Sequence, residues 1–324
     1  MKMKKIIALL LVALMLPVFA SCQIDDGKYT VGICQLVQHS ALDAATQGFI
    51  DAINDEMGEG TVTFLNENAS NDPSVCTTIV NNFVSKKVDL IMANATPALQ
   101  AAVNGTADIP ILGTSVTAYS VALGIDIKDN LIGENVSGTS DLAPLDLQAN
   151  MITDLFPATK KVALLFCNGE PNSKYQVVEI AKLLSAKNVE TKEFGFTDSN
   201  DVSAVAASAA AWADVIYIPT DNTAASCTET INGVIGNTPL IAGEEGICSG
   251  CGVATLTIDY YDLGYTTGKM AAKILKGEAK ISEMKIEFVP EEKCKYKYNA
   301  EKCSAFNIDT AALEAKGYTA IGAK

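Results

Sequence analysis

The feature that most constrains this chain is an alternation of short β-branched runs with longer segments that carry apolar residues at helical spacing. This pattern is typical of βαβ units, in which connecting helices cover parallel strands, and here it occurs twice. In the first half, strands are predicted at residues 29–34, 62–66, 88–93 and 111–114, and helices at residues 41–57, 73–85 and 97–103. In the second half, strands are predicted at residues 162–167, 189–194, 215–219 and 240–242, and helices at residues 173–186, 201–211 and 223–234. The sequence therefore predicts two α/β lobes with parallel sheets.

The two halves also repeat one another in sequence, and short segments mark where the chain crosses between them. Residues 87–91 correspond to residues 213–216, and residues 109–112 correspond to residues 238–241. The glycine-rich, polar stretch 133–141 is predicted to be the first crossing. A second crossing is expected near residues 258–260, because a long helical pattern follows a strand there. The predicted lobes are residues 29–138 plus about 261–280, and residues 139–260 plus about 281–324.

The N-terminal segment has the pattern of an export signal. Three lysines precede an apolar run from residue 6 to residue 20, and small residues then lead to Cys22. The run is shorter than the ~20 residues that a membrane-spanning helix needs. Residues 1–21 are interpreted as a secretory signal peptide, Cys22 as a lipidation site and residues 22–28 as a lipidated linker. The mature protein is expected to be exported and anchored at the outer face of a bacterial cytoplasmic membrane, or to be periplasmic.

The charge of the chain excludes one class of partner and limits how an acidic ligand can be held. All 24 basic residues are lysines, acidic residues number 38, and the formal net charge is −14. Nucleic-acid binding is not expected, because it depends on clustered positive charge. A carboxylate ligand would have to be held without the bidentate guanidinium clamp that arginine provides.

Ligands of open parallel sheets bind beyond the carboxyl ends of the strands, so the residues at those ends are the candidate site. In the first lobe they are Gln38, His39, Thr96, Thr114 and Ser115. In the second lobe they are Asn172, Ser173, Asp221, Asn222, Thr223, Glu244 and Glu245, and Asp259 and Tyr260 lie at the crossing. The first set consists mainly of hydroxyls and amides, whereas the second contains carboxylates. Facing sets of this kind suit an amino acid, with its carboxylate on the first lobe and its ammonium on Asp221 or Glu244; the reverse polarity stays open.

The sequence offers little support for catalysis. His39 is the single histidine, and no G-x-S-x-G, phosphate-loop, dinucleotide-binding or histidine-rich metal motif is present. No catalytic residue, cofactor or metal is therefore predicted. Cys248 and Cys251 form a C-x-x-C pair, interpreted as loop or disulfide cysteines because no helix start is predicted beside them to stabilise a thiolate. An exported thiol–disulfide oxidoreductase remains the alternative from another class. Cys34 and Cys167 are interpreted as small buried hydrophobic residues.

Six motifs in order resemble one known family. They lie at residues 32–43, 88–98, 219–223, 242–246, 258–261 and 264–277. Together they resemble the tryptophan/tyrosine-type substrate-binding lipoproteins of ABC importers, and the match runs from about residue 29 to residue 280. The resemblance implies a type I periplasmic-binding-protein fold, with two Rossmann-like lobes joined by three crossovers and the ligand trapped between them. It further implies delivery to a membrane permease powered by a separate ATPase.

These observations predict a monomeric extracytoplasmic receptor that closes by a hinge motion on a small ligand, most simply an aromatic or other hydrophobic amino acid. A sensor that presents another small solute, such as a nucleoside, is the alternative within the binding proteins. The tail after Pro290 departs from the family pattern, and no element is predicted within it.

Overall fold

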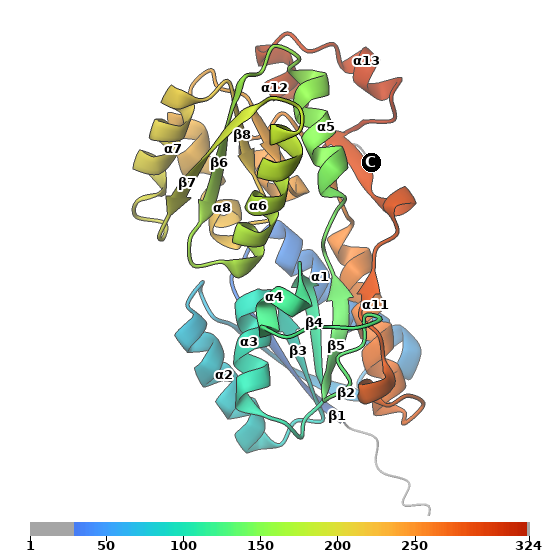
Figure 1. Cartoon of the computed structure of the whole chain (residues 1–324). Helices are drawn as coiled ribbons and strands as arrows, with labels where there is room; N and C mark the ends of the chain where they lie inside the picture. The colour runs from blue at the N-terminus through green and yellow to red at the C-terminus, as the bar shows by residue number, and fades with distance from the viewer. Residues whose placement is uncertain (1–28, 323–324) are drawn as a thin grey trace, which may run out of the picture.

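The computed structural model describes residues 29–322 and arranges them as two α/β lobes stacked one on the other (Figure 1). The predicted fold class, two Rossmann-like lobes with mainly parallel sheets and three connecting segments, is confirmed. The predicted signal peptide, the lipidated linker and Cys22 lie outside the described residues. Among residues 29–322, no helix combines the length and the apolar character needed to cross a membrane.

The first lobe is built on a six-stranded parallel sheet with the strand order β11-β5-β4-β3-β1-β2. The strands span Tyr29–Gln35 (β1), Val62–Asn68 (β2), Leu90–Asn94 (β3), Ile111–Val116 (β4), Val136–Ser140 (β5) and Glu287–Phe288 (β11). Strands β3 and β4 are buried along their whole length, because helices cover both faces of the sheet. The covering helices are α2 (Pro73–Lys86) and α3 (Thr96–Gly105) on one face, and α1 (Ser40–Met57) and α11 (Tyr260–Leu275) on the other. A short helix, α4 (Tyr119–Leu123), follows β4.

Two glycines allow α1 and α11 to pack closely although they are far apart in the chain. A Cβ atom at Gly48 would overlap the carbonyl oxygen of Tyr261, and one at Gly264 would overlap the carbonyl oxygen of Ala45. The backbones of the two helices therefore touch, as small residues permit. Helix α11 follows most of the second lobe in the chain, and this contact packs it against the first lobe.

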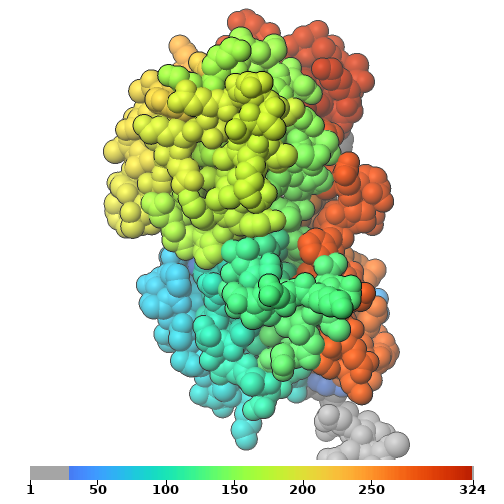
Figure 2. Space-filling view, viewed as in Figure 1, coloured from blue at the N-terminus to red at the C-terminus, as the bar shows by residue number. Residues whose placement is uncertain are grey.

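The second lobe contains a seven-stranded sheet with the order β13-β12-β10-β9-β8-β6-β7, in which only the β10–β12 pair is antiparallel. Its strands are Lys161–Cys167 (β6), Glu190–Phe196 (β7), Val215–Ile218 (β8), Leu240–Ala242 (β9), Ala254–Thr257 (β10), Lys295–Tyr298 (β12) and Thr319–Ala320 (β13). Its helices are Leu145–Leu155 (α5), Pro171–Ser185 (α6), Val202–Trp212 (α7), Asn222–Ser226 (α8), Thr228–Val234 (α9), Glu245–Cys251 (α10), Ala300–Ala305 (α12) and Thr310–Glu314 (α13). Two apolar clusters, one on each face of the sheet, form its core. Figure 2 shows the C-terminal part of the chain, coloured orange to red, along one side of both lobes.

Two lobe boundaries differ from the prediction. Residues 133–141 were expected to cross between lobes, but β5 pairs with β4 inside the first sheet, so the crossing falls at residues 141–144. Residues 281–324 were assigned to the second lobe, but β11 pairs with β5, so the third crossing falls at residues 289–294. Strand β5 was not predicted, because most of its residues are not apolar although all of them are buried. Its Thr139 hydroxyl lies 3.2 Å from that of Thr114 and 2.8 Å from that of Thr267.

The C-x-x-C pair does not lie in a loop. Cys248 and Cys251 belong to helix α10, whose first amides are capped by the side chain of Glu244. Both are almost fully buried, and the eight cysteines of residues 29–322 are free thiols. Cys34 and Cys167 are buried in the cores of the two lobes, as predicted.

Candidate functional site

The carboxyl ends of the two sheets face each other where the lobes meet (Figure 1). His39, which follows β1, places Nε2 3.3 Å from Oδ1 of Asn222 at the start of α8. Asn71, which follows β2, donates its side-chain amide to the Thr223 hydroxyl at 3.0 Å. Strand-end loops of both lobes are therefore in direct contact, and the cleft between them is closed around the predicted site residues.

The first lobe brings two hydroxyls without partners to its strand ends. Thr96 begins α3 after β3, and Ser115 lies near the end of β4; they are 2% and 5% exposed. Neither hydroxyl has a hydrogen-bond partner. The backbone is strained at both strand ends, since Ala95 has φ 90° and Ser115 has φ 54°. Strain and unpaired buried polar atoms both concentrate where a protein receives a ligand.

In the second lobe, the buried carboxylate of Glu170 accepts hydrogen bonds from the first residues of α8. Its Oε2 accepts from the backbone amide of Asn222 at 2.9 Å and from the side-chain amide at 2.7 Å. Its Oε1 accepts from the amide and the hydroxyl of Thr223, both at 2.8 Å. The side-chain amide of Asn172 also donates to Oε2, at 3.2 Å. Glu170 is 3% exposed, so five donors hold a buried carboxylate at the cleft. The sequence analysis did not select this residue.

Asp221 and Glu244, the predicted ammonium partners, already use their oxygens as backbone caps. Asp221 accepts from the amides of Cys167 at 2.6 Å and Ala224 at 2.8 Å. Glu244 accepts from the amides of Gly246 and Ile247. Burial, together with the charge of Glu170, raises the pKa of Asp221. Burial also raises the pKa of Glu244, against the opposing influence of His39.

Asn172 offers the free acceptor that the neighbouring carboxylates lack. Its side-chain amide donates to the carbonyl of Thr220 at 3.0 Å and lies within hydrogen-bond reach of Glu170 and Ser173. Its Oδ1 is buried and has no partner. The Ser173 hydroxyl also lies toward the Thr220 carbonyl, at 3.4 Å. The predicted residues Asn172, Ser173, Asp221, Asn222 and Thr223 therefore form one network.

A fourth buried carboxylate, Asp141, lies on the first crossing. It accepts from the hydroxyl of Thr117 at 2.9 Å and from the hydroxyl of Tyr260 at 2.9 Å. Burial raises its pKa to about 6. Glu244 lies close enough for its charge to add to this increase. Asp141 and Thr117 were not selected from the sequence, because recognising them required the unpredicted strand β5.

Among residues 29–322, no lysine pairs with Asp141, Glu170, Asp221 or Glu244. Ionised carboxylates buried without a cation are unfavourable, and the raised pKa values of Asp141, Asp221 and Glu244 reflect that cost. Glu244 and Tyr260 also line a cavity of about 240 Å³ between α1 and α10, at the interface of the lobes. The polar arrangement is suited to a ligand that brings a positive group to the second lobe and accepts hydrogen bonds from the first.

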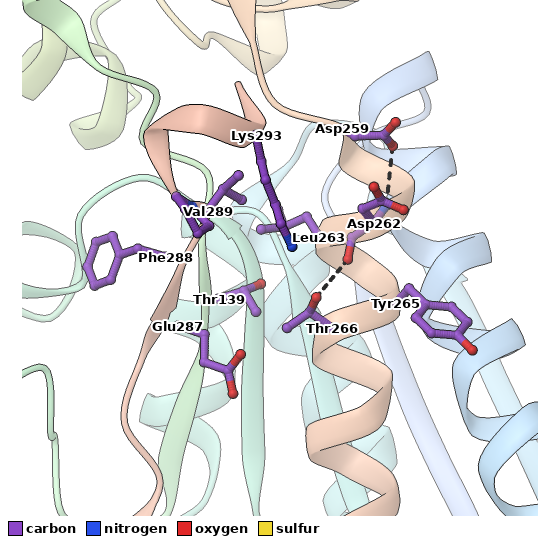
Figure 3. A pocket seen from close by; sticks show the side chains of 11 residues that line it. Thr139, Asp259, Asp262, Leu263, Tyr265, Thr266, Glu287, Phe288, Val289 and Lys293 are labelled. Atoms are coloured by element: carbon purple, nitrogen blue, oxygen red, sulfur yellow. Dashed lines mark hydrogen bonds between the residues drawn. The ribbon is translucent and has the colours of Figure 1, made fainter. Parts of the chain in front are cut away.

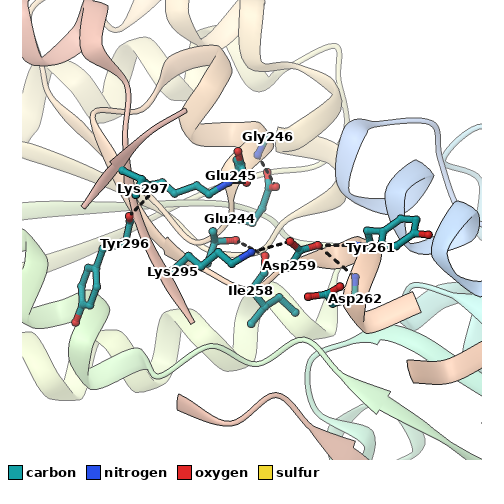
Figure 4. A network of polar contacts seen from close by, with 12 residues as sticks. Glu244, Glu245, Gly246, Ile258, Asp259, Tyr261, Asp262, Lys295, Tyr296 and Lys297 are labelled. Carbon is teal, nitrogen blue, oxygen red and sulfur yellow. Dashed lines mark hydrogen bonds and ion pairs between the residues drawn. The ribbon is translucent and has the colours of Figure 1, made fainter. Parts of the chain in front are cut away.

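Other predicted residues lie outside this network. The Thr114 hydroxyl contacts that of Thr139 inside the first lobe, and Gln38 is exposed to solvent. Glu245 pairs with Lys297 at 2.6 Å and Asp259 pairs with Lys295 at 2.9 Å, so both carboxylates contact the tail (Figure 4).

A larger cavity lies away from the network, between α11 and the third crossing (Figure 3). Its volume is about 440 Å³, and Leu263, Thr266, Phe288 and Lys293 are among the residues that line it. Thr96, Ser115, Asn172 and Glu170 are not among its lining residues. The candidate ligand site is therefore assigned to the strand-end loops and not to this cavity.

With this geometry described, the chain can be compared with known proteins. Residues 30–309 match the model of the ABC transporter substrate binding protein family. A tyrosine-binding protein of Clostridioides difficile (strain R20291) is 35% identical over 297 residues, covering 86% of each chain. The chain belongs to the family of ABC transporter substrate-binding proteins, as the sequence motifs predicted.

Two solved structures show how the lobes are arranged in relatives. The ABC domain from Streptococcus pneumoniae in complex with L-Trp has a TM-score of 0.85 at 27% identity, covering 91% of this chain and 100% of that one. The ligand-free, open structure of a Clostridium difficile substrate-binding protein with adhesive properties has a TM-score of 0.69 at 34% identity, with the same coverage. The lobes here are thus arranged more like those of the L-Trp complex, although the open protein is closer in sequence. The contacts between His39 and Asn222 and between Asn71 and Thr223 agree with a closed state.

Proposed function

We propose that this substrate-binding protein captures an amino acid, tyrosine or tryptophan in the first instance, and presents it to the permease of an ABC importer. One observation carries the proposal. Four buried carboxylates without a lysine partner lie at the same interface as two buried hydroxyls without any partner. A zwitterion supplies what both sets lack, because it brings a cation and a carboxylate together.

The polarity of binding follows from the available atoms. The hydroxyls of Thr96 and Ser115 are donors for the ligand carboxylate, which is held without an arginine. The free Oδ1 of Asn172 is the acceptor for the ammonium. Glu170, Asp221 and Glu244 are held in place by donors of the protein, and we assign them an electrostatic role around the ammonium, whereas the wholly unpaired Oδ1 of Asn172 makes the direct contact. This modifies the expectation of direct contact between the ammonium and Asp221 or Glu244.

Aromatic specificity is supported by the relatives, one named for tyrosine binding and one solved with L-Trp. The ring of Tyr119 is buried in the first lobe, and its hydroxyl donates to the carbonyl of Thr139 at 3.1 Å, so this ring is not free to stack on a ligand. The ring pocket is therefore expected to be formed by other apolar residues at the strand ends.

The proposal includes the cellular setting. The protein is exported, anchored through a lipid on Cys22, monomeric and without catalytic activity, and a separate ATPase powers the permease. The oxidoreductase alternative is disfavoured, because burial raises the pKa of the Cys248 and Cys251 thiols and a redox C-x-x-C needs a lowered one.

The experiment is a thermal-unfolding panel on residues 23–324, because a ligand that binds only the folded state raises the midpoint by mass action. L-Tyrosine and L-tryptophan are expected to raise the midpoint by several degrees. Two analogues test the polarity. 3-(4-Hydroxyphenyl)propionate lacks the ammonium and should not shift the midpoint. Tyramine lacks only the carboxylate and should give part of the midpoint shift seen with L-tyrosine. Nucleosides and sugars serve as the comparison set.

A residue-level test accompanies the panel. Asn172→Leu is expected to weaken binding of the effective amino acid by roughly tenfold or more, since it removes the free acceptor for a charged donor. Asn200→Leu, on the exposed loop before α7, is the matched control and should leave affinity unchanged. Midpoint shifts confined to nucleosides or sugars would contradict the amino-acid assignment.

A further inference from the structure

The three segments that cross between the lobes are packed into one small hinge cluster. Ala143 comes from the first crossing, Ile258 and Tyr260 from the second, and Val289 and Cys294 from the third. They share an apolar cluster with Ala41, Ala45 and Leu263 of helices α1 and α11. Any rotation of one lobe against the other must change the contacts of this cluster.

Two polar contacts cross-link the same three segments. Tyr260, on the second crossing, donates its hydroxyl to Asp141 on the first at 2.9 Å. The neighbouring residue Asp259 pairs with Lys295, which follows the third crossing, also at 2.9 Å (Figure 4). Asp259 also caps α11 by accepting from the amides of Tyr261 at 3.1 Å and Asp262 at 3.2 Å. Two consecutive residues therefore join all three crossings.

The two contacts differ in burial, and we therefore expect them to differ in strength. Tyr260 and Asp141 are 7% and 4% exposed, so their hydrogen bond lies in a medium of low polarity. The Lys295 and Asp259 side chains are 48% and 37% exposed, so water and salt screen their attraction. The tyrosine contact is the stronger of the two.

We infer that Tyr260 and Lys295 are positioning residues that hold the three crossings in the closed arrangement and so set the affinity for the solute without contacting it. Ligand affinity is reduced in proportion to the fraction of protein in the binding-competent state. Loss of either contact favours the open state and weakens binding, while the direct contacts of the ligand stay intact. The inference rests on the proposed function only for the identity of the solute.

The chain provides matched controls for both residues. Tyr261, the next residue, also donates its hydroxyl to an aspartate at 2.9 Å, but Asp51 lies on α1 in the same lobe. Lys276 pairs with Glu56 at 3.2 Å, again between α11 and α1. These contacts resemble the hinge pair in chemistry and do not join the crossings.

The experiment compares Tyr260→Phe with Tyr261→Phe and Lys295→Met with Lys276→Met. Small-angle scattering gives the radius of gyration without ligand, and calorimetric titration with the amino acid that shifts the thermal midpoint gives Kd. Tyr260→Phe is expected to enlarge the ligand-free radius of gyration and raise Kd roughly tenfold, and Lys295→Met to raise Kd about two- to threefold. Both should regain the wild-type radius at saturating ligand, and Lys295→Arg should restore the wild-type Kd.

The outcomes separate the inference from the proposed function. If Tyr260→Phe matches Tyr261→Phe within twofold in Kd and has the same ligand-free radius, the inference is overturned while the amino-acid assignment stands. If no amino acid binds, the proposed function fails, and ligand-free scattering alone decides the inference. An unchanged radius in Tyr260→Phe would then overturn it. A thermal midpoint for each ligand-free variant verifies that it is folded.

Discussion

The two lobes share one architecture but present different chemistry to the cleft between them. In the first lobe, the hydroxyls of Thr96 and Ser115 are buried and have no partner. In the second lobe, the carboxylates of Glu170, Asp221 and Glu244 are buried and accept from amide and hydroxyl donors of the protein. The second-lobe carboxylates are thus held by the protein itself, whereas the first-lobe hydroxyls are not.

This difference indicates which part of the binding energy each lobe provides. The second lobe fixes its negative field before the ligand arrives, because backbone amides hold its carboxylates in place. The first lobe keeps donors that no group of the protein satisfies. The contrast predicts that substitutions of the second-lobe carboxylates chiefly reduce stability, whereas substitutions of the first-lobe hydroxyls chiefly reduce affinity.

The largest effect is expected from Glu170→Ala. The change leaves buried donors of Asn222 and Thr223 without an acceptor, and each such group costs about 1–3 kcal/mol. Relief of the repulsion between Glu170 and Asp221 offsets part of this loss. We expect a net decrease in the free energy of unfolding of about 3 kcal/mol, measured by urea denaturation. Glu190→Ala, at an exposed position of β7, is the control, and a loss below about 1 kcal/mol would contradict the role given to Glu170.

An intermediate effect is expected from pH. Burial raises the pKa of Asp141 to about 6, so the folded protein holds this proton more tightly than the unfolded chain, whose aspartates titrate near 4. The associated stabilisation is complete below about pH 4 and is lost as pH rises through about 6. The protein without ligand should therefore become less stable as pH rises from about 4 to about 6, as denaturation at each pH would reveal.

Ligand affinity should change with pH in the opposite sense. An ammonium favours the ionised form of Asp141, so affinity is expected to rise with pH up to about 6 and to level off above it, by at most about tenfold per unit for one linked proton. Binding then releases protons, which calorimetry in buffers of different ionisation enthalpy detects. Asp141→Asn should remove the change centred near pH 6. Proton uptake on binding would refute this arrangement of charges.

The smallest effect on stability, and the sharpest test of the contrast, is expected from Thr96→Val. Because the hydroxyl has no partner in the ligand-free fold, its loss should change the free energy of unfolding by less than about 0.5 kcal/mol. Affinity should nevertheless fall roughly tenfold, since a donor to the ligand carboxylate is lost.

Thr159→Val is the control for this change. The Thr159 hydroxyl is also buried without a partner, but it precedes β6 at the opposite end of the strand from the cleft. Affinity should be unaffected there. Equal losses in the two variants would show that unpartnered hydroxyls in this protein do not mark the site.

The sequence predicted the regular elements well where they bury apolar residues on a regular period. Strands β1, β3, β6 and β8 and helices α1 and α2 were found within a few residues of their observed bounds. Strand β5 was missed because Ser137, Gly138 and Thr139 are polar, and their burial is made possible by hydroxyl contacts with distant residues. Helix α10 was missed because glycines and cysteines give little helical signal, and its Glu244 cap became apparent only in the fold.

The candidate site was predicted in position but not in detail. Loops after parallel strands necessarily gather at one edge, so Asn172, Asp221, Asn222 and Thr223 were selected correctly as neighbours. Glu170 and Asp141 were not selected, because their importance depends on which donors surround them. Thr114 follows the same strand-end rule, yet its hydroxyl contacts that of Thr139 inside the lobe, and Thr139 in turn contacts Thr267.

By itself the sequence determined the two-lobe α/β architecture, the family and the edge of each sheet at which the candidate residues gather. These depend on local periodicity and on ordered motifs, both of which are properties of neighbouring residues in the chain. Only the tertiary structure decided which carboxylates are already satisfied, which hydroxyls are free, and how Asp259 and Tyr260 join the three crossings. Those properties depend on partners as many as 119 residues apart, as in the contact of Tyr260 with Asp141, and distances of that kind are set only when the chain has folded.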